Sequence, residues 1–152
     1  MLKTKGRRDG SLIFDPPPIG SVLYLPGLPG AGATIFDRSP YGNNGTITGA
    51  TWVFQNGIWV LSFDGLDDIV VCGNDMSLRL TTLSLSFWFN LSVAGGYLAT
   101  KWRSVPAQQG YVLFLQAANG RPAIQINTTG YNSNVGSSLA NSKPHFMTTV
   151  IN

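Results

Sequence analysis

The chain has 152 residues, which is enough for one domain with a sizeable hydrophobic core. All seven acidic residues are aspartates and there is no glutamate. Because Glu is among the residues that normally fill helix surfaces, this composition excludes a largely helical protein and indicates an all-β one. Four of the ten positive charges lie in the first eight residues, as Lys3, Lys5, Arg7 and Arg8, so the net charge of +3 belongs to an arm and the rest of the chain is nearly neutral.

Residues 1–20 form a basic, proline-rich stretch in which three prolines follow Asp15. Consecutive prolines favour an extended connector, so we expect an arm and linker at residues 1–20 and a β-domain at residues 21–152. The arm is either a solvated terminus or an anchor onto an acidic surface or nucleic acid. Of these partners we expect another protein subunit and not nucleic acid. No apolar segment has the length of a secretory signal core or a membrane span, so membrane insertion is not expected.

Short β-rich runs separated by Gly, Asn and Pro turns predict about ten strands along the chain. An Asn56-Gly57 turn joins two of them into a hairpin over residues 51–63, because both positions tolerate positive φ. One helical turn is expected at residues 75–80, with Asp75 as its cap. The expected strands are residues 22–25, 46–48, 51–54, 58–63, 69–72, 82–91, 97–102, 111–117, 123–128 and 145–151.

The run at residues 82–91 alternates most clearly between apolar and polar residues. Its odd-numbered positions from Leu83 to Leu91 are all apolar, and the other positions are polar except for Trp88. This period of two predicts a strand with one face on the core. Many short antiparallel strands with frequent turns favour a β-sandwich.

Three blocks of sequence resemble the laminin-G-like branch of the concanavalin A-like lectins and glucanases. They are DRSPYGNNGT at residues 37–46, LSFDGLDDIV at 61–70 and LSLSFWF at 83–89, with Trp52 between the first two. Members of that family typically show an Asp-x-Ser-Gly-x-Gly-x-x-Gly turn, a Phe-x-Gly-x-x-Asp hairpin and a strand ending in tryptophan. The resemblance implies an antiparallel jelly-roll β-sandwich over residues 21–152.

The chain departs from the family pattern at two places. Pro40 replaces the usual glycine after the serine, which should stiffen that turn. Residues 143–152 resemble a family strand that is normally followed by further strands, so we expect a sandwich that lacks its C-terminal strands. Either more chain or a neighbouring chain would then cover an open sheet edge, since unpaired edges associate readily.

Glucanases with this fold use closely spaced Glu and Asp residues as nucleophile and acid. Without glutamate that arrangement cannot form, and the one acidic cluster is Asp64, Asp67 and Asp68. The single histidine, His145, lies in an apolar run and is expected to be structural. We therefore expect no enzymatic activity and no catalytic residues.

Calcium is a candidate cofactor, because the resemblance implies sites built from Asp side chains and loop carbonyls, which suit Ca²⁺. The candidate ligands are Asp37, Asp67 and Asp68. The alternative for Asp37 is that its carboxylate accepts hydrogen bonds from its own turn.

A glycan-binding surface needs an aromatic side chain that stacks on a sugar ring, with polar groups around it. Trp88 on the polar side of its strand fits this requirement, with Asn90 beside it, and Tyr97, Trp102 and Tyr131 are further candidates. The alternative is that Trp88 packs between the sheets, since tryptophan is usually buried.

These observations favour a non-catalytic, lectin-like adhesion or decoration module. We expect it on a virion surface, such as a phage head or tail, or in another extracellular assembly. Its expected partners are copies of itself or capsid or tail subunits, reached through the arm and the open sheet edge, and cell-surface glycans. The alternatives are a purely structural assembly protein and a fragment of a larger adhesin or glycosidase.

Overall fold

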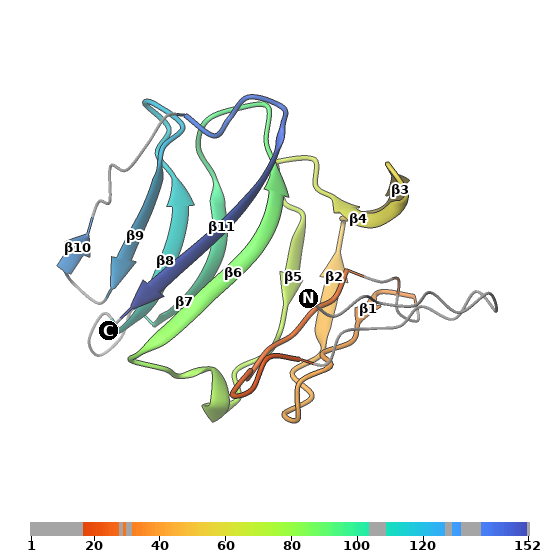
Figure 1. Cartoon of the computed structure of the whole chain (residues 1–152), viewed down its shortest axis with the longest axis vertical. Coiled ribbons are helices and arrows are strands. Elements are labelled where there is room, and N and C mark those ends of the chain that lie inside the picture. Colours follow the sequence, from red (N-terminus) through yellow and green to blue (C-terminus); the bar gives the residue numbers. More distant parts are fainter. Residues whose placement is uncertain are drawn as a thin grey trace, which may run out of the picture. The chain divides into compact units, whose positions relative to one another are not determined.

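A computed structural model describes residues 17–27, 29, 32–103, 109–126, 129–131 and 138–151 (Figure 1). Within these residues the chain is all-β, with every sheet antiparallel and one short 3₁₀ helix, which confirms the predicted class. Among them, no helix has the length and apolar character needed to cross a membrane. The arm residues Lys3, Lys5, Arg7 and Arg8 lie outside the described residues. The chain divides into two compact units, Met1–Ser77 and Leu78–Asn152.

The first unit holds two small sheets, one ordered β1-β2-β5 and the other the pair β3-β4. Its core consists of Ile35, Ile47 and Ala50, against which the partly buried Trp52 and Leu61 of the β3-β4 pair also pack. Its strands are β1 (Thr34–Ile35), β2 (Gly45–Thr48), β3 (Thr51–Gln55), β4 (Ile58–Ser62) and β5 (Ile69–Val71), and the helix η1 (Met76–Leu78) begins at its end.

The β3-β4 pair is the predicted hairpin. Asn56 and Gly57 both have positive φ, 53° and 84°, as the tight two-residue turn requires. The predicted helical turn is also present, and the Ser77 backbone N–H donates to Asp75 Oδ1 at 2.8 Å, which is a capping contact.

Residues 22–25 do not form the predicted strand. The Tyr24 N–H donates to the carboxylate of Asp37 at 2.7 Å, and its carbonyl accepts from the Arg38 N–H at 2.9 Å. A side chain therefore takes the donor that a sheet ladder would use. Every other predicted strand is present with somewhat different bounds, whereas β1 is too short for a sequence pattern to indicate.

The second unit consists of a four-stranded sheet, ordered β10-β9-β8-β7, and the pair β11-β6. In Figure 1, β6 and β11 lie side by side in front of β7, β8 and β9. The strands are β6 (Leu83–Asn90), β7 (Tyr97–Arg103), β8 (Gln109–Leu115), β9 (Pro122–Ile126), β10 (Thr129–Tyr131) and β11 (Pro144–Ile151).

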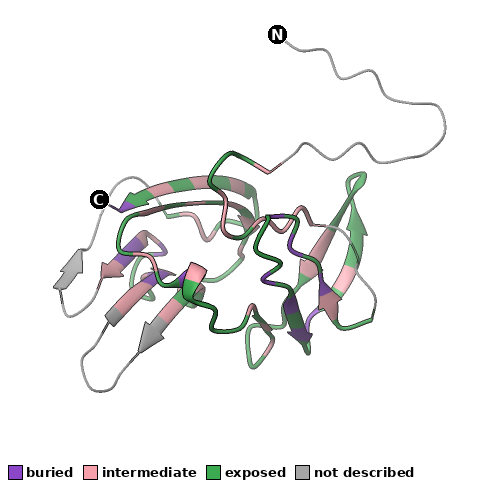
Figure 2. Ribbon diagram, turned by 90° about the horizontal axis from the view of Figure 1, so that it is seen from below, coloured by how far each residue is buried: buried purple, intermediate pink, exposed green. Residues whose placement is uncertain are grey.

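These two sheets pack face to face around one core. Leu113, Ile124 and Ile151 are its buried centre. Leu85 and Phe87 contribute from β6, as their alternation predicts. Along β11, Figure 2 shows exposed and partly buried residues alternating up to the buried Ile151 near the C label.

The last strand, β11, pairs with β6 along its whole length, in a register that places Phe146 opposite Trp88. Within the described part of the chain, β6 is the only strand that β11 pairs with. One edge of β11 is therefore paired with β6, and none of the described strands pairs with its other edge.

Candidate functional site

The outward side of the β6-β11 pair is the first candidate site, which we call the aromatic face. Its residues alternate with those that enter the core, so all of them are exposed. None is charged. The aromatic face consists of Ser84, Ser86, Trp88 and Asn90 from β6 and Pro144, Phe146, Thr148 and Val150 from β11.

Two rings form the centre of the aromatic face. Trp88 is 71% exposed and Phe146 is 56% exposed. Their ring centroids lie 5.1 Å apart at an interplanar angle of 42°, a spacing typical of aromatic pairs. The alternative that Trp88 packs between the sheets is therefore wrong. The antiparallel register of β6 and β11 places Phe146 directly opposite Trp88 and so holds the two rings together.

Polar groups bracket this aromatic pair along the strands. On one side, Ser86 Oγ and Thr148 Oγ1 lie 3.0 Å apart across the strands. On the other side, Asn90 stands opposite Pro144. Each hydroxyl has lone pairs left beyond this contact, and the Asn90 amide offers both donors and acceptors. An aromatic centre with neutral hydrogen-bonding groups on both sides can bind a ligand that carries both an apolar face and hydroxyl groups.

The structure does not bring Tyr97 to Trp88. Tyr97 is 77% exposed and begins β7, where it stands opposite Phe114 of β8 with the ring centroids 6.3 Å apart. The neighbouring position Leu113 is buried in the core that faces β6 and β11. Since adjacent residues of a strand point to opposite sides, Phe114 and Tyr97 face away from the β6-β11 layer.

Of the remaining glycan candidates, Trp102 lies in β7 and Tyr131 in β10. Their side chains are outside the described residues. Sequence reasoning missed Phe146, because both sides of β11 carry apolar residues and only the pairing with β6 shows which side faces outward.

Asp37 is the centre of a hydrogen-bonded turn in the first unit. It is 8% exposed. Its Oδ1 accepts from the N–H groups of Tyr24 and Ser39, at 2.7 and 2.8 Å. Its Oδ2 accepts from the Ser39 hydroxyl and the Asn43 N–H, at 2.6 and 2.7 Å. Protein donors thus occupy both oxygens. This is the alternative to calcium binding considered for Asp37, in which its carboxylate accepts hydrogen bonds from its own turn.

The electrostatics of Asp37 agree with that arrangement. Burial favours the neutral acid and acts to raise the pKa of Asp37, but the hydrogen bonds from Ser39, Tyr24 and Asn43 outweigh it. The pKa of Asp37 is therefore lower than that of an ordinary aspartate, and the carboxylate is held charged. Because its oxygens already accept four hydrogen bonds, Asp37 does not fit the role of a calcium ligand.

Asp67 and Asp68 lie with Asp64 in the turn between β4 and β5, and their carboxylate oxygens lie within 4.8 Å of one another. Two of the three carboxylates also support the turn: Asp68 Oδ2 accepts from the Asp64 N–H at 2.7 Å, and Asp64 Oδ1 accepts from the Leu66 N–H at 2.8 Å. Three carboxylates fit the ligand preference of Ca²⁺. The calcium candidates thus reduce to this turn.

His145 occupies the inward side of β11. Its Nε2 lies 2.8 Å from Asn141 Oδ1, and its ring contacts that of Phe89 at 5.8 Å. These contacts agree with the structural role expected for it.

Comparison of the chain with protein-family models, with curated proteins and with solved structures finds no match.

Proposed function

We propose that the chain is a non-catalytic, glycan-binding module that decorates a surface, built on a laminin-G-like jelly-roll sandwich. The sequence blocks at residues 37–46, 61–70 and 83–89 support that family. The face-to-face packing of two antiparallel sheets in the second unit agrees with it. The function itself depends on the aromatic face.

The observation that carries the proposal is the exposed Trp88–Phe146 pair in neutral, hydroxyl-bearing surroundings. Large apolar side chains are normally withdrawn from water, and two adjacent ones at the centre of a polar surface form a platform. A pyranose ring has an apolar C–H side that such a platform can cover. Its hydroxyls then reach the Ser86–Thr148 pair on one side and Asn90 on the other.

The size of the platform sets a modest affinity for each site. Covering about 100 Å² of ring surface contributes about 2.5 kcal/mol, and each hydrogen bond adds about 1 kcal/mol. A Kd of about 1 mM corresponds to about 4 kcal/mol. The loss of translational and rotational freedom on association offsets part of this gain. A single aromatic face therefore binds no more tightly than the millimolar range, and useful adhesion requires many linked copies.

That requirement supports placing the module on a repetitive surface, such as a phage head or tail, or another extracellular assembly. Copies of the chain, or capsid or tail subunits, would be its protein partners, and cell-surface glycans its targets. The basic arm, Lys3 to Arg8 in sequence, would provide the attachment.

The test is a glycan array probed with the full chain displayed in many copies on beads. We expect binding to a subset of neutral glycans, and at least a tenfold loss of signal for Trp88→Ala and for Phe146→Ala. Tyr41→Ala is the matched control, because it removes another exposed aromatic ring, 58% exposed, from the first unit. Equal binding by Trp88→Ala and Tyr41→Ala, or no binding to any glycan, would refute the proposal.

A second candidate function, structural assembly, is favoured by the β3-β4 hairpin. Residues 51–63 contain no charged residue, yet Phe54 and Ile58 near the turn are 60% and 62% exposed. The Phe54 ring contacts that of Trp59 at 5.3 Å. Phe54 and Ile58 belong to neighbouring pairs of the ladder and project to opposite sides of the hairpin. Both sides of the hairpin near its turn are therefore apolar and exposed, which suits burial against another subunit.

A further inference from the structure

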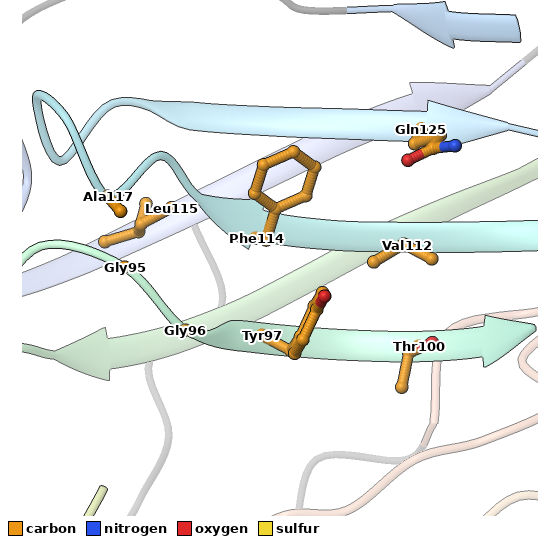
Figure 3. Close-up of a pocket in the computed structure, with 9 residues that line it drawn as sticks. All are labelled: Gly95, Gly96, Tyr97, Thr100, Val112, Phe114, Leu115, Ala117 and Gln125. Atoms are coloured by element: carbon orange, nitrogen blue, oxygen red, sulfur yellow. The ribbon is translucent and has the colours of Figure 1, made fainter.

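The outward side of the β7-β8-β9 sheet contains a pocket of about 530 Å³, which we call the outer pocket (Figure 3). Tyr97 and Thr100 from β7, Val112 and Phe114 from β8 and Gln125 from β9 line it. Its volume falls within the range of about 300–1,000 Å³ usual for small-molecule sites. In Figure 3, β6 and β11 pass behind this sheet, so the outer pocket and the aromatic face lie on opposite sides of the second unit.

A β-bulge in β7 creates the outer pocket. Tyr97 stands opposite Phe114 and Ala99 opposite Leu113, so Leu98 is an extra residue in the pairing. Leu98 and Ala99 both pack against the core. The next outward residues on either side are therefore Tyr97 and Thr100, which pair with Phe114 and Val112.

The bulge widens the spacing between outward side chains from two residues to three, and the surface is hollow at that point. Gly96 precedes Tyr97 with a φ of 93°, and a Cβ there would meet nothing within 4 Å, so the approach to the pocket is also open. Bulges commonly occur beside binding sites, where they redirect a side chain.

The lining has the composition of a site for a neutral, hydroxyl-bearing ring. Val112 is a buried floor, and the rings of Tyr97 and Phe114 form a tilted aromatic wall. The Thr100 hydroxyl, the Tyr97 phenol and the Gln125 amide are the polar groups at its margin. None of the described residues that line the pocket is charged, so no ion pair selects the ligand.

We propose that the outer pocket is a second saccharide site, separate from the aromatic face, and that it binds a neutral pyranose with one side of the ring against Tyr97. The Thr100 hydroxyl and the Gln125 amide bind hydroxyls of the sugar. The choice of ligand class rests on the proposed function, but the outer pocket shares no residue with the aromatic face. With two sites on opposite sides, one copy of the chain can bridge two glycan strands.

The test is NMR titration of the ¹⁵N-labelled full chain with the methyl pyranosides of glucose, galactose and N-acetylglucosamine. We expect at least one of them to shift the amide signals of Gly96, Tyr97 and Phe114. Thr100→Trp fills the pocket while keeping a good strand former, and should raise the Kd of these shifts at least tenfold. Thr82→Trp is the control, because Thr82 is exposed and outside the strands.

Gln125→Ala provides a second, smaller change that removes only the amide, and should weaken binding several-fold. The amide signals of Trp88 and Phe146 report sugar binding at the aromatic face in the same spectra. Their sugar-induced shifts should be lost in Trp88→Ala and kept in Thr100→Trp and Gln125→Ala. Absence of shifts around Gly96 and Tyr97 with all three sugars, or identical shifts in Thr100→Trp, would overturn the outer-pocket inference while leaving the proposed function intact. Shifts at the outer pocket without any at Trp88 would support the outer-pocket site and refute glycan binding at the aromatic face.

Discussion

Replacing Asp37 should destabilise the first unit more than any exposed aspartate does. Its carboxylate accepts four hydrogen bonds of 2.6–2.8 Å from Tyr24, Ser39 and Asn43. Asp37→Ala would leave these donors without a partner, and each buried unsatisfied donor costs about 1–3 kcal/mol. Because water can reach part of the turn, we expect a loss of about 3–5 kcal/mol, against a typical total stability of about 5–15 kcal/mol.

Asp37→Asn separates the two carboxylate oxygens. The amide oxygen can still accept from Tyr24 and Ser39 at the Oδ1 position, but the amide nitrogen would face the Asn43 N–H at the Oδ2 position. The Ser39 hydroxyl can rotate to accept instead, whereas the Asn43 N–H cannot. We therefore expect a loss of about 2 kcal/mol, close to the cost of one unsatisfied donor and a weakened charge-assisted bond.

The assay is urea unfolding followed by tryptophan fluorescence, with hydrogen exchange at the Tyr24, Ser39 and Asn43 amides. Asp67→Asn, measured with EDTA present, is the matched control, because Asp67 is exposed, and should change stability by less than about 0.5 kcal/mol. Treatment with EDTA should leave the cost of Asp37→Asn unchanged, because the partners of Asp37 are protein donors. Equal stability of the Asp37→Asn and Asp67→Asn variants would refute this account of the turn.

The pH dependence follows from the lowered pKa of Asp37. In the unfolded chain this carboxyl has an ordinary pKa of about 3.9, above its folded value. Its contribution to stability is therefore complete above about pH 5 and is lost as the pH falls below 4 and through the folded pKa. Asp37→Asn should remove that part of the acid loss, so the wild type and the variant should converge in stability at low pH.

Two further predictions concern the surfaces proposed for assembly. Ile58→Lys, at an exposed position of the β3-β4 hairpin, should weaken self-association or particle attachment at least tenfold in sedimentation assays and leave glycan binding unchanged. Leu66→Lys, which is also at an exposed position, is the control. Equal effects of the two variants would exclude the hairpin as the assembly surface. Deleting residues 2–20 should abolish salt-sensitive particle association, since it removes four of the ten basic residues; unchanged association at low salt would exclude attachment by charge.

Local signals in the sequence were enough to predict much of the fold. The Asn56-Gly57 turn and the alternation from Leu83 to Asn90 depend on neighbouring residues alone, and both are present as predicted. Residues 22–25 failed as a strand because the decisive partner, Asp37, lies well beyond the local window. Local β-propensity describes a tendency, and a long-range hydrogen bond replaced it here.

The candidate site depends on information that local patterns do not hold. Alternation placed Trp88 on the polar side of its strand, but whether another layer covers that side is a property of the whole sheet. Phe146 joins it through the β6-β11 register, and Tyr97 is separated from it by sheet membership. The bulge at Leu98 also breaks simple alternation in β7, so the shared orientation of Tyr97 and Thr100 cannot be predicted by counting in twos.

The charge distribution separates the two interactions proposed for this chain. Neither the aromatic face nor the described lining of the outer pocket carries a charged residue, so binding there should depend little on ionic strength. The arm carries Lys3, Lys5, Arg7 and Arg8 within eight residues, and attraction of such a segment to an acidic surface is screened beyond about 8 Å at physiological salt. The proposed attachment to a particle and the proposed adhesion to a glycan should thus respond to different variables. A rise in salt should weaken the first, whereas the second should depend on how many copies the particle presents.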